Sequence, residues 1–201
     1  MPFLLRVELP DVPGSLGRVA TAIGEAGGDI EAIEIVEKRD GTAVDDVLLE
    51  MYDGAMPDSV VSACNMLEDV RVMWISRYAA GGNIFLDLEV VEELTADPGK
   101  ALDRVIDLLP VAFRSDWAMR IHRSKGVVRQ TDAAPEELPF VDMEKAARLE
   151  VHGDDVNIYA GARIDGNNMV VIGRRGGPEF VDSELARLGH LVSLAASLAG
   201  S

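Results

Sequence analysis

The segment Asp11-Val12-Pro13-Gly14-Ser15-Leu16 decides how the first half of the chain folds. It follows an apolar run at residues 3–9, which predicts a β-strand, and it precedes apolar residues at helical spacing. A strand that breaks at a Pro-Gly turn directly into a helix leaves backbone N–H groups free at the helix start. Those groups and the helix dipole favour a carboxylate or another small anion. The segment therefore indicates a small-molecule sensor more than a catalyst.

The patterns around this segment predict a β-α-β-β-α-β unit over residues 1–78, the split βαβ order of ferredoxin-like folds. Ser15 is expected to cap the first helix, which Gly27-Gly28 end. Asp40-Gly41 predicts a hairpin between the second and third strands. The remaining expected elements are strands at residues 30–36, 43–52 and 70–78 and a helix at 57–67 that buries Cys64.

Residues 79–83 contain Gly81-Gly82 and are expected to link this unit to a second domain over residues 84–201. The second domain is predicted to be a helical pair followed by an antiparallel sheet and a long closing helix, so the fold class is α+β. The first helix of this domain is expected to start at Asn83, with Leu88 on its buried face, and the second to follow Pro98-Gly99. A short helix is expected at Met143–Leu149, and a long closing helix after a cap at Asp182 or Ser183. The strands are expected at residues 117–122, 126–131, 156–164 and 169–173, with a loop over 134–141.

Composition limits the classes of function. The chain of 201 residues is 48% hydrophobic, 27% charged and 5% aromatic, which is typical of a globular protein. Its net charge of −16 and the excess of acids in both halves exclude a basic surface for nucleic acid or anionic membranes. A single cysteine, Cys64, excludes an internal disulfide, and no apolar run is long enough to span a membrane. Without a signal-peptide pattern, we expect a cytoplasmic protein.

The order of elements, with residues 11–16 at the first turn, resembles an ACT domain over about residues 3–78. The run Ile23-Gly24-Glu25-Ala26-Gly27-Gly28-Asp29-Ile30-Glu31-Ala32-Ile33 is similar to ACT segments attached to some bacterial malic enzymes. The resemblance implies that an amino acid or a similar metabolite binds where two ACT units pair. Asp29 stands where many amino-acid-binding members carry Asn, and its charge disfavours a second carboxylate nearby.

The second half resembles a GAF domain. The resemblance lies in an opening strand at residues 117–121, a late strand at 169–175, and a closing segment at 177–185 that continues through Leu188, His190 and Leu191. It implies an antiparallel sheet flanked by helices, which in some members holds a small-molecule pocket.

One candidate ligand site follows from the turn and the ACT resemblance. Backbone N–H groups of Gly14, Ser15 and Leu16 are expected to bind a carboxylate, and Asp11 or Asp29 to hold an ammonium group. In the alternative, the turn merely starts a helix and the two aspartates serve as a turn residue and a solvated acid. The predicted ligand-binding residues are Asp11, Pro13, Gly14, Ser15, Leu16, Asp29 and Ile30.

Other motifs are given structural interpretations. Gly24, Gly27 and Gly28 do not form a nucleotide fingerprint and are expected to serve close packing and a helix end. Gly173-Arg174-Arg175-Gly176-Gly177 could bind phosphate, but a solvated loop is favoured. His122, His152 and His190 lack the spacing of metal ligands. We therefore predict no metal, no cofactor and no catalytic residues.

The leading interpretation is a homodimeric regulatory protein, not an enzyme, that senses an amino acid and signals to a separate protein partner. One alternative is an enzyme built on the same scaffolds. Another is an interaction subunit without a ligand. An interaction subunit of this kind would have a filled cavity in its second domain, and its turn at residues 11–16 would be buried by side chains.

Overall fold

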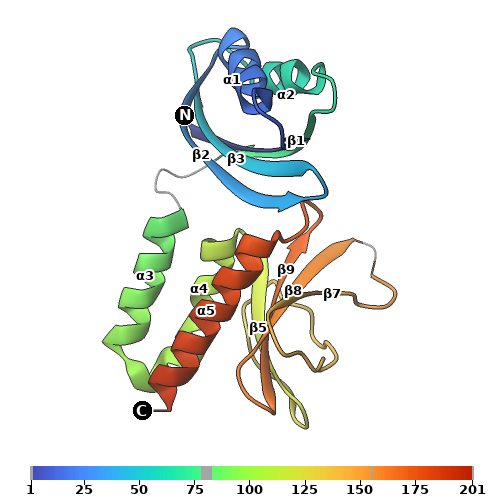
Figure 1. Cartoon of the computed structure of the whole chain (residues 1–201). Coiled ribbons are helices and arrows are strands. Elements are labelled where there is room, and N and C mark those ends of the chain that lie inside the picture. The colour runs from blue at the N-terminus through green and yellow to red at the C-terminus, as the bar shows by residue number, and fades with distance from the viewer. Residues whose placement is uncertain (1, 78–82, 155, 201) are drawn as a thin grey trace. The chain divides into compact units, whose positions relative to one another are not determined.

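The computed structural model describes residues 2–77, 83–154 and 156–200, and the chain divides into two compact units, Met1–Ala80 and Gly81–Ser201 (Figure 1). The linker predicted at residues 79–83 lies outside the described residues except for Asn83, so its boundaries stay a prediction.

The first unit has the predicted β-α-β-β-α-β order. Its sheet has the strand order β2-β3-β1-β4, and every neighbouring pair is antiparallel. The β2–β3 hairpin turns at Asp40-Gly41, as expected. Its elements are β1 (Pro2–Pro10), α1 (Ser15–Glu25), β2 (Gly28–Arg39), β3 (Thr42–Met51), α2 (Pro57–Asn65) and β4 (Arg71–Arg77).

Strand alternation gives this sheet one apolar face, which α1 and α2 cover (Figure 1). Leu5 and Val7 of β1 pack with Ile23 of α1, and with Val60 and Cys64 of α2. All five side chains are fully buried, which confirms the expected core position of Cys64.

The ends of α1 depend on glycine geometry. Gly14 is the N-cap residue with a left-handed φ of 92°, and no side chain caps the helix. The prediction that Ser15 caps α1 is wrong, because Ser15 is already the first helical residue. At the other end, a Cβ on Gly28 would lie 2.7 Å from Cγ2 of Ile23, so close packing explains this glycine. Gly24 has open space around it, so close packing does not explain that position.

The second unit is an antiparallel sheet with a helical layer, as predicted. The sheet has the strand order β6-β5-β9-β8-β7. The helical elements are α3 (Asn83–Ala96), the 3₁₀ turn η1 (Pro98–Lys100), α4 (Ala101–Phe113) and α5 (Asp182–Ala199). The strands are β5 (Trp117–His122), β6 (Gly126–Gln130), β7 (Ala147–Leu149), β8 (Asn157–Arg163) and β9 (Asn168–Arg175).

The helical layer covers one face of this sheet (Figure 1). Leu94 of α3, Ile106 of α4 and Leu188 of α5 share a core with Val170 and Ile172 of β9. The expected burial of Leu88 is wrong, because its side chain is 53% exposed while Val90 is buried instead. Val91 and Leu94 lie on the core side of α3 as well, so the buried face includes residues 90, 91 and 94 and leaves Leu88 outside it.

Two local predictions in the second unit are also wrong. The segment Met143–Leu149 is not helical, because residues 147–149 pair with β8 as the edge strand β7. This sheet pairing overrides the helical spacing of the sequence. The N-cap of α5 is Val181, not Asp182 or Ser183, and the Glu184 carboxylate accepts a hydrogen bond from the Val181 N–H at 2.9 Å.

Candidate ligand site

The predicted anion-binding turn lies on the surface, between β1 and α1. Asp11, Pro13 and Gly14 are exposed, Leu16 is half-buried and Ser15 is buried. The Ser15 N–H donates to the Val12 carbonyl at 3.2 Å, so this group is already occupied within the turn. No described residue accepts a backbone hydrogen bond from Gly14 or Leu16. The turn thus offers two of the three predicted N–H donors.

Gly14 also lies at one end of a shallow groove of about 410 Å³, which runs along one face of α1. Arg18 lines this groove one turn after Gly14, and Leu67 closes it from beyond the end of α2. Sequence reasoning missed Arg18. The signal for it was present, because Arg18 is the only basic residue between Leu9 and Lys38.

The two aspartates predicted to hold an ammonium group lie far apart in one copy of the chain. Asp11 accepts a hydrogen bond from Lys38 Nζ at 2.7 Å, and its own N–H donates to the Gly41 carbonyl at 2.8 Å. Asp29 pairs with Glu50 at the other end of β2. Lys38 lies nine positions after Asp29 on the same strand, which is about 30 Å at the usual rise. One copy therefore does not bring Asp11 and Asp29 to the same ammonium group.

Ile30 directly follows Asp29 on β2 and is half-buried against the helix-covered core. Pro13 lies in the exposed turn. The predicted site residues therefore divide into a turn cluster (Asp11, Pro13, Gly14, Ser15 and Leu16) and a strand pair (Asp29 and Ile30).

Two acidic residues inside β3 were missed from the sequence. Asp45 pairs with Val7 and therefore lies on the helix-covered face of the sheet. Its side chain is buried, and no described residue bonds to its Oδ1 atom. Burial raises the pKa of the Asp45 carboxyl, while nearby Lys38 lowers it. The signal in the sequence was the pair Asp45-Asp46 inside an apolar strand.

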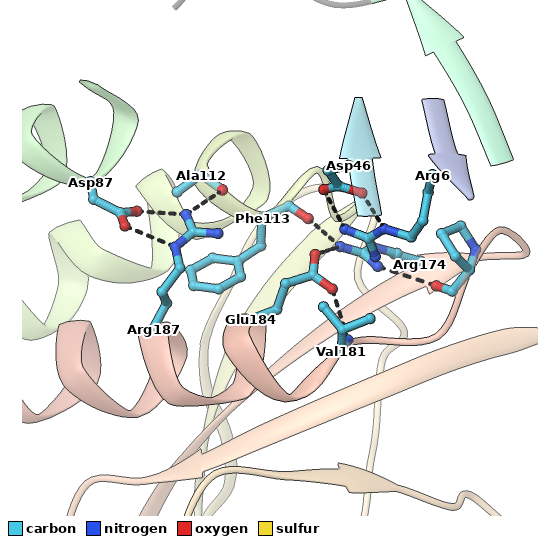
Figure 2. Close-up of polar contacts among 10 residues, drawn as sticks. Arg6, Asp46, Asp87, Ala112, Phe113, Arg174, Val181, Glu184 and Arg187 are labelled. Carbon is cyan, nitrogen blue, oxygen red and sulfur yellow. Dashed lines mark hydrogen bonds and ion pairs between the residues drawn. The ribbon is translucent and has the colours of Figure 1, made fainter. Parts of the chain in front are cut away.

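Asp46 points to the opposite face and forms a two-point ion pair with Arg6. Arg6 Nε and Nη2 donate to the two carboxylate oxygens at 2.6 and 2.8 Å (Figure 2). Such a pair holds β1 and β3 together in one register, because the fork of the guanidinium matches the carboxylate.

In the second unit, Arg174 is a buried structural residue. It donates to the Phe113 carbonyl at 2.7 Å, to the Pro178 carbonyl at 3.1 Å, and to the Glu184 carboxylate (Figure 2). Its guanidinium also lies 3.9 Å from the centre of the Phe180 ring. The favoured interpretation of a solvated loop is wrong for Arg174. Its donors are directed at the protein, so it is not aimed at a phosphate either.

The sheet face opposite the helical layer is filled with apolar side chains. Trp117, Met119 and Met169 are buried there, and Leu138 and Phe140 of the following irregular segment pack over them. The Val141 N–H also contacts the sulfur of Met169 at 3.2 Å. This filled face is the feature expected of a second domain without a ligand.

The described parts of the chain show neither a cluster suited to a metal ion nor a helix suited to cross a membrane. Within residues 2–77, 83–154 and 156–200, no cluster of three His, Cys, Asp or Glu side chains is placed to hold a metal ion. Across these residues, no helix combines the length and apolar character needed to cross a membrane.

Comparison with known families decides the identity of the first unit: residues 3–63 match the family model of the ACT domain. This segment is an ACT domain. ACT domains are regulatory domains that sense small molecules, and the resemblance predicted from residues 11–16 and 23–33 is confirmed.

A curated relative matches in the same region. The chain is 37% identical over 73 residues to NAD-dependent malic enzyme 1 of Bacillus subtilis. The match covers 36% of this chain but only 17% of the enzyme, so the shared part is a small fraction of that protein.

The solved structures that resemble the chain include GAF domains. The GAF domain of a phosphoenolpyruvate-protein phosphotransferase from Acinetobacter aligns with 61% of this chain and 95% of its own, at 11% identity and a TM-score of 0.46. The GAF domain of a putative sensor histidine kinase from Pseudomonas syringae pv. tomato covers 57% of this chain and 83% of its own, at 13% identity and a TM-score of 0.43.

Proposed function

We propose that the protein is a regulatory protein without catalytic activity, and that its ACT domain binds an amino acid. The observation that carries this proposal is the exposed turn of the ACT domain, where Gly14 lines a groove with Arg18 and where, among the described residues, the N–H groups of Gly14 and Leu16 have no backbone acceptor. A carboxylate placed at this turn receives two backbone donors and a guanidinium, in the field of the α1 dipole.

The ammonium group of such a ligand has Asp11 as its acceptor within the same copy. Asp11 is 39% exposed and is held by Lys38, whose own side chain is 52% exposed and can be displaced. We assign the ammonium to Asp11 in preference to Asp29, because Asp11 belongs to the same turn as the carboxylate donors.

A second copy of the chain brings Asp29 into the site. β2 is an edge strand, and Ile33 and Ile35 near its middle are 37% and 50% exposed. An exposed edge with apolar side chains favours pairing with another strand. Antiparallel pairing about the middle of residues 28–39 places Asp29 opposite Lys38 of the second copy, next to the turn that carries Asp11.

This arrangement couples ligand binding to assembly. A ligand that contacts both copies favours the paired state, and such a difference in affinity is what a regulatory signal requires. The signal then passes to a separate protein. The apolar side chains that fill the sheet face opposite the helical layer favour partner contact over ligand binding at that face.

A thermal-shift screen of the full chain against the proteinogenic amino acids tests the proposal first. A ligand at a hundredfold excess over its dissociation constant stabilises the protein by about 2.7 kcal/mol. Calorimetry then compares the wild type with Arg18→Gln and with Arg71→Gln, a control on the exposed β4 edge of the same unit.

We expect Arg18→Gln to weaken the ligand identified in the screen by about tenfold or more, because a hydrogen bond to a charged group is lost. Arg71→Gln should leave the affinity unchanged. Equal affinity in the wild type and both variants would place the site elsewhere, and a strict monomer by light scattering with bound ligand would remove the role of the second copy. Turnover of any substrate, lost on substitution within residues 117–175, would favour the enzyme alternative.

A further inference from the structure

A second hollow lies in the other unit, against α5. This α5 groove has a volume of about 500 Å³, and all of its lining belongs to the second unit. Asp182, Ala186, Gly189 and Ser193 recur at helical spacing and therefore form one face of α5. The opposite walls are residues 144–146 before β7 and residues 162–163 at the end of β8.

The floor of the α5 groove is made of small and apolar groups. Ala162 is 1% exposed, and Ala146 and Leu185 are half-buried beside it. A Cβ built on Gly189 would lie 3.5 Å from the Cβ of Ala146, so the helix and the opposite wall approach closely here. This floor suits a short apolar body.

The rim of the α5 groove carries basic side chains. Lys145, Arg163 and His190 are exposed at the edge of the groove. Among the described residues, no carboxylate forms an ion pair with Lys145 or Arg163, and Arg163 Nε donates only to the Asp165 carbonyl at 3.2 Å. By contrast, Arg129 and Arg187 of the same unit each bind an aspartate within 2.7 Å.

The acidic residues of the lining do not cancel this charge. Asp182 is held by Arg148 at 3.0 Å, which leaves Glu144 as the acid without an ion pair in the lining. The large negative charge of the rest of the chain acts weakly here, because salt screens exposed charges beyond about 8 Å at physiological ionic strength. The local field of the rim therefore favours an anion.

We propose that the α5 groove binds a small organic anion, a carboxylate on a short apolar body. The carboxylate lies between Lys145 and Arg163, with His190 and the Ser193 hydroxyl as further donors. The apolar body covers Ala146, Ala162 and Gly189. The volume is within the usual range of small-molecule sites, about 300–1,000 Å³. This site is separate from the turn of the ACT domain and requires no ligand there.

The full chain labelled with ¹⁵N is titrated with hexanoate and, in parallel, with uncharged hexanamide, and amide shifts are followed by NMR. Hexanoate should shift amides of residues 144–146, 162–163 and 185–193 and saturate with a dissociation constant below about 10 mM. Hexanamide should bind much more weakly, because it lacks the charge. Equal shifts with both probes, or hexanoate shifts confined to other residues, would overturn the proposal.

Three variants locate the site. The double variant Lys145→Gln, Arg163→Gln should raise the dissociation constant of hexanoate about fivefold, as expected for two exposed charge contacts. Gly189→Leu should abolish binding, because its side chain fills the floor. Lys125→Gln removes an exposed cation from the β5–β6 turn and should change the constant less than twofold. Binding that survives Gly189→Leu in a protein with an intact spectrum would also overturn the proposal.

Discussion

Gly173 of β9 lies directly beneath the indole ring of Trp117 on β5. The two residues are paired across the sheet, and a Cβ built on Gly173 would lie 2.1 Å from Cζ2 of Trp117. Tyr159, the partner of Gly173 on its other side, has its ring centre 5.7 Å from that of Trp117. Two aromatic rings, from the two strands that flank β9, therefore share the space above one glycine.

This contact makes Gly173→Ala a severe change. The added methyl group cannot enter without moving a buried indole, so we expect the free energy of unfolding to fall by about 3 kcal/mol. Urea unfolding followed by fluorescence measures it. Gly166→Ala is the control, because Gly166 lies in the β8–β9 turn with nothing within 4 Å of an added Cβ. A similar small effect of both variants would contradict the reported contact.

Arg174 and Arg175 are neighbours with opposite roles. Arg174→Met removes the guanidinium that pairs with the buried Glu184 carboxylate, and loss of one partner of a buried ion pair costs about 3–5 kcal/mol. Arg175→Met changes an exposed side chain and should alter stability by less than about 0.5 kcal/mol. Thermal unfolding of the two variants should therefore differ widely, and equal midpoints would show that the network around Arg174 contributes little.

Asp45 should give the protein a defined dependence on pH. Burial raises its pKa in the folded protein above the ordinary value of 3.8, so the folded state holds this proton more tightly than the unfolded state. The contribution of Asp45 to the free energy of unfolding is therefore most favourable below pH 3.8. It becomes less favourable as the pH rises from 3.8 through the raised pKa, and it does not recover at higher pH.

Asp45→Asn removes that ionisation. We expect the variant to unfold at higher urea concentration than the wild type at neutral pH, with the difference shrinking as the pH approaches 3.8. Asp53→Asn, on an exposed loop, serves as the control. A destabilised Asp45→Asn protein at neutral pH would mean that the charged carboxylate is stabilised by its surroundings.

Two glycines at the ends of α1 should respond to alanine in opposite directions. Gly24 is helical with open space around it, so Gly24→Ala should stabilise the protein by about 0.5–1 kcal/mol through helix propensity. Gly14 has a left-handed φ of 92°, so Gly14→Ala should destabilise it by about 1 kcal/mol or more. Chemical denaturation of both variants checks the assigned backbone geometry.

The architecture of the first unit could be predicted because its signals are local. Alternation along β1 and β3, the Asp40-Gly41 turn and the glycines after α1 each indicate one element, and their order leaves one topology. The β1–α1 turn was located in the same way. The set of free N–H donors at this turn could not be predicted from the sequence. The hydrogen bond from the Ser15 N–H to the Val12 carbonyl depends on the backbone conformation of the turn.

The errors have a common cause, which is contact between residues distant in the sequence. Arg174 looks solvated beside three glycines, yet Phe113 and Glu184 bury it. β7 has only three residues and exists because β8 lies next to it, so no periodicity reveals it. The separation of Asp11 and Asp29 follows from strand direction, which the two acids by themselves do not indicate.

The irregular segment over residues 132–146 gives the second unit two levels of stability. This segment covers the filled face through apolar contacts such as Phe140, and Arg123 ties it by an ion pair to Asp142 at 2.7 Å. Its backbone is outside the hydrogen-bonded ladder, so it can lift while the sheet and helices stay folded. Amide hydrogen exchange should be fast here and slow in β5 and β9. A thermal melting curve of this protein therefore measures the unfolding of the sheet. It gives little information about the earlier opening of the segment over residues 132–146.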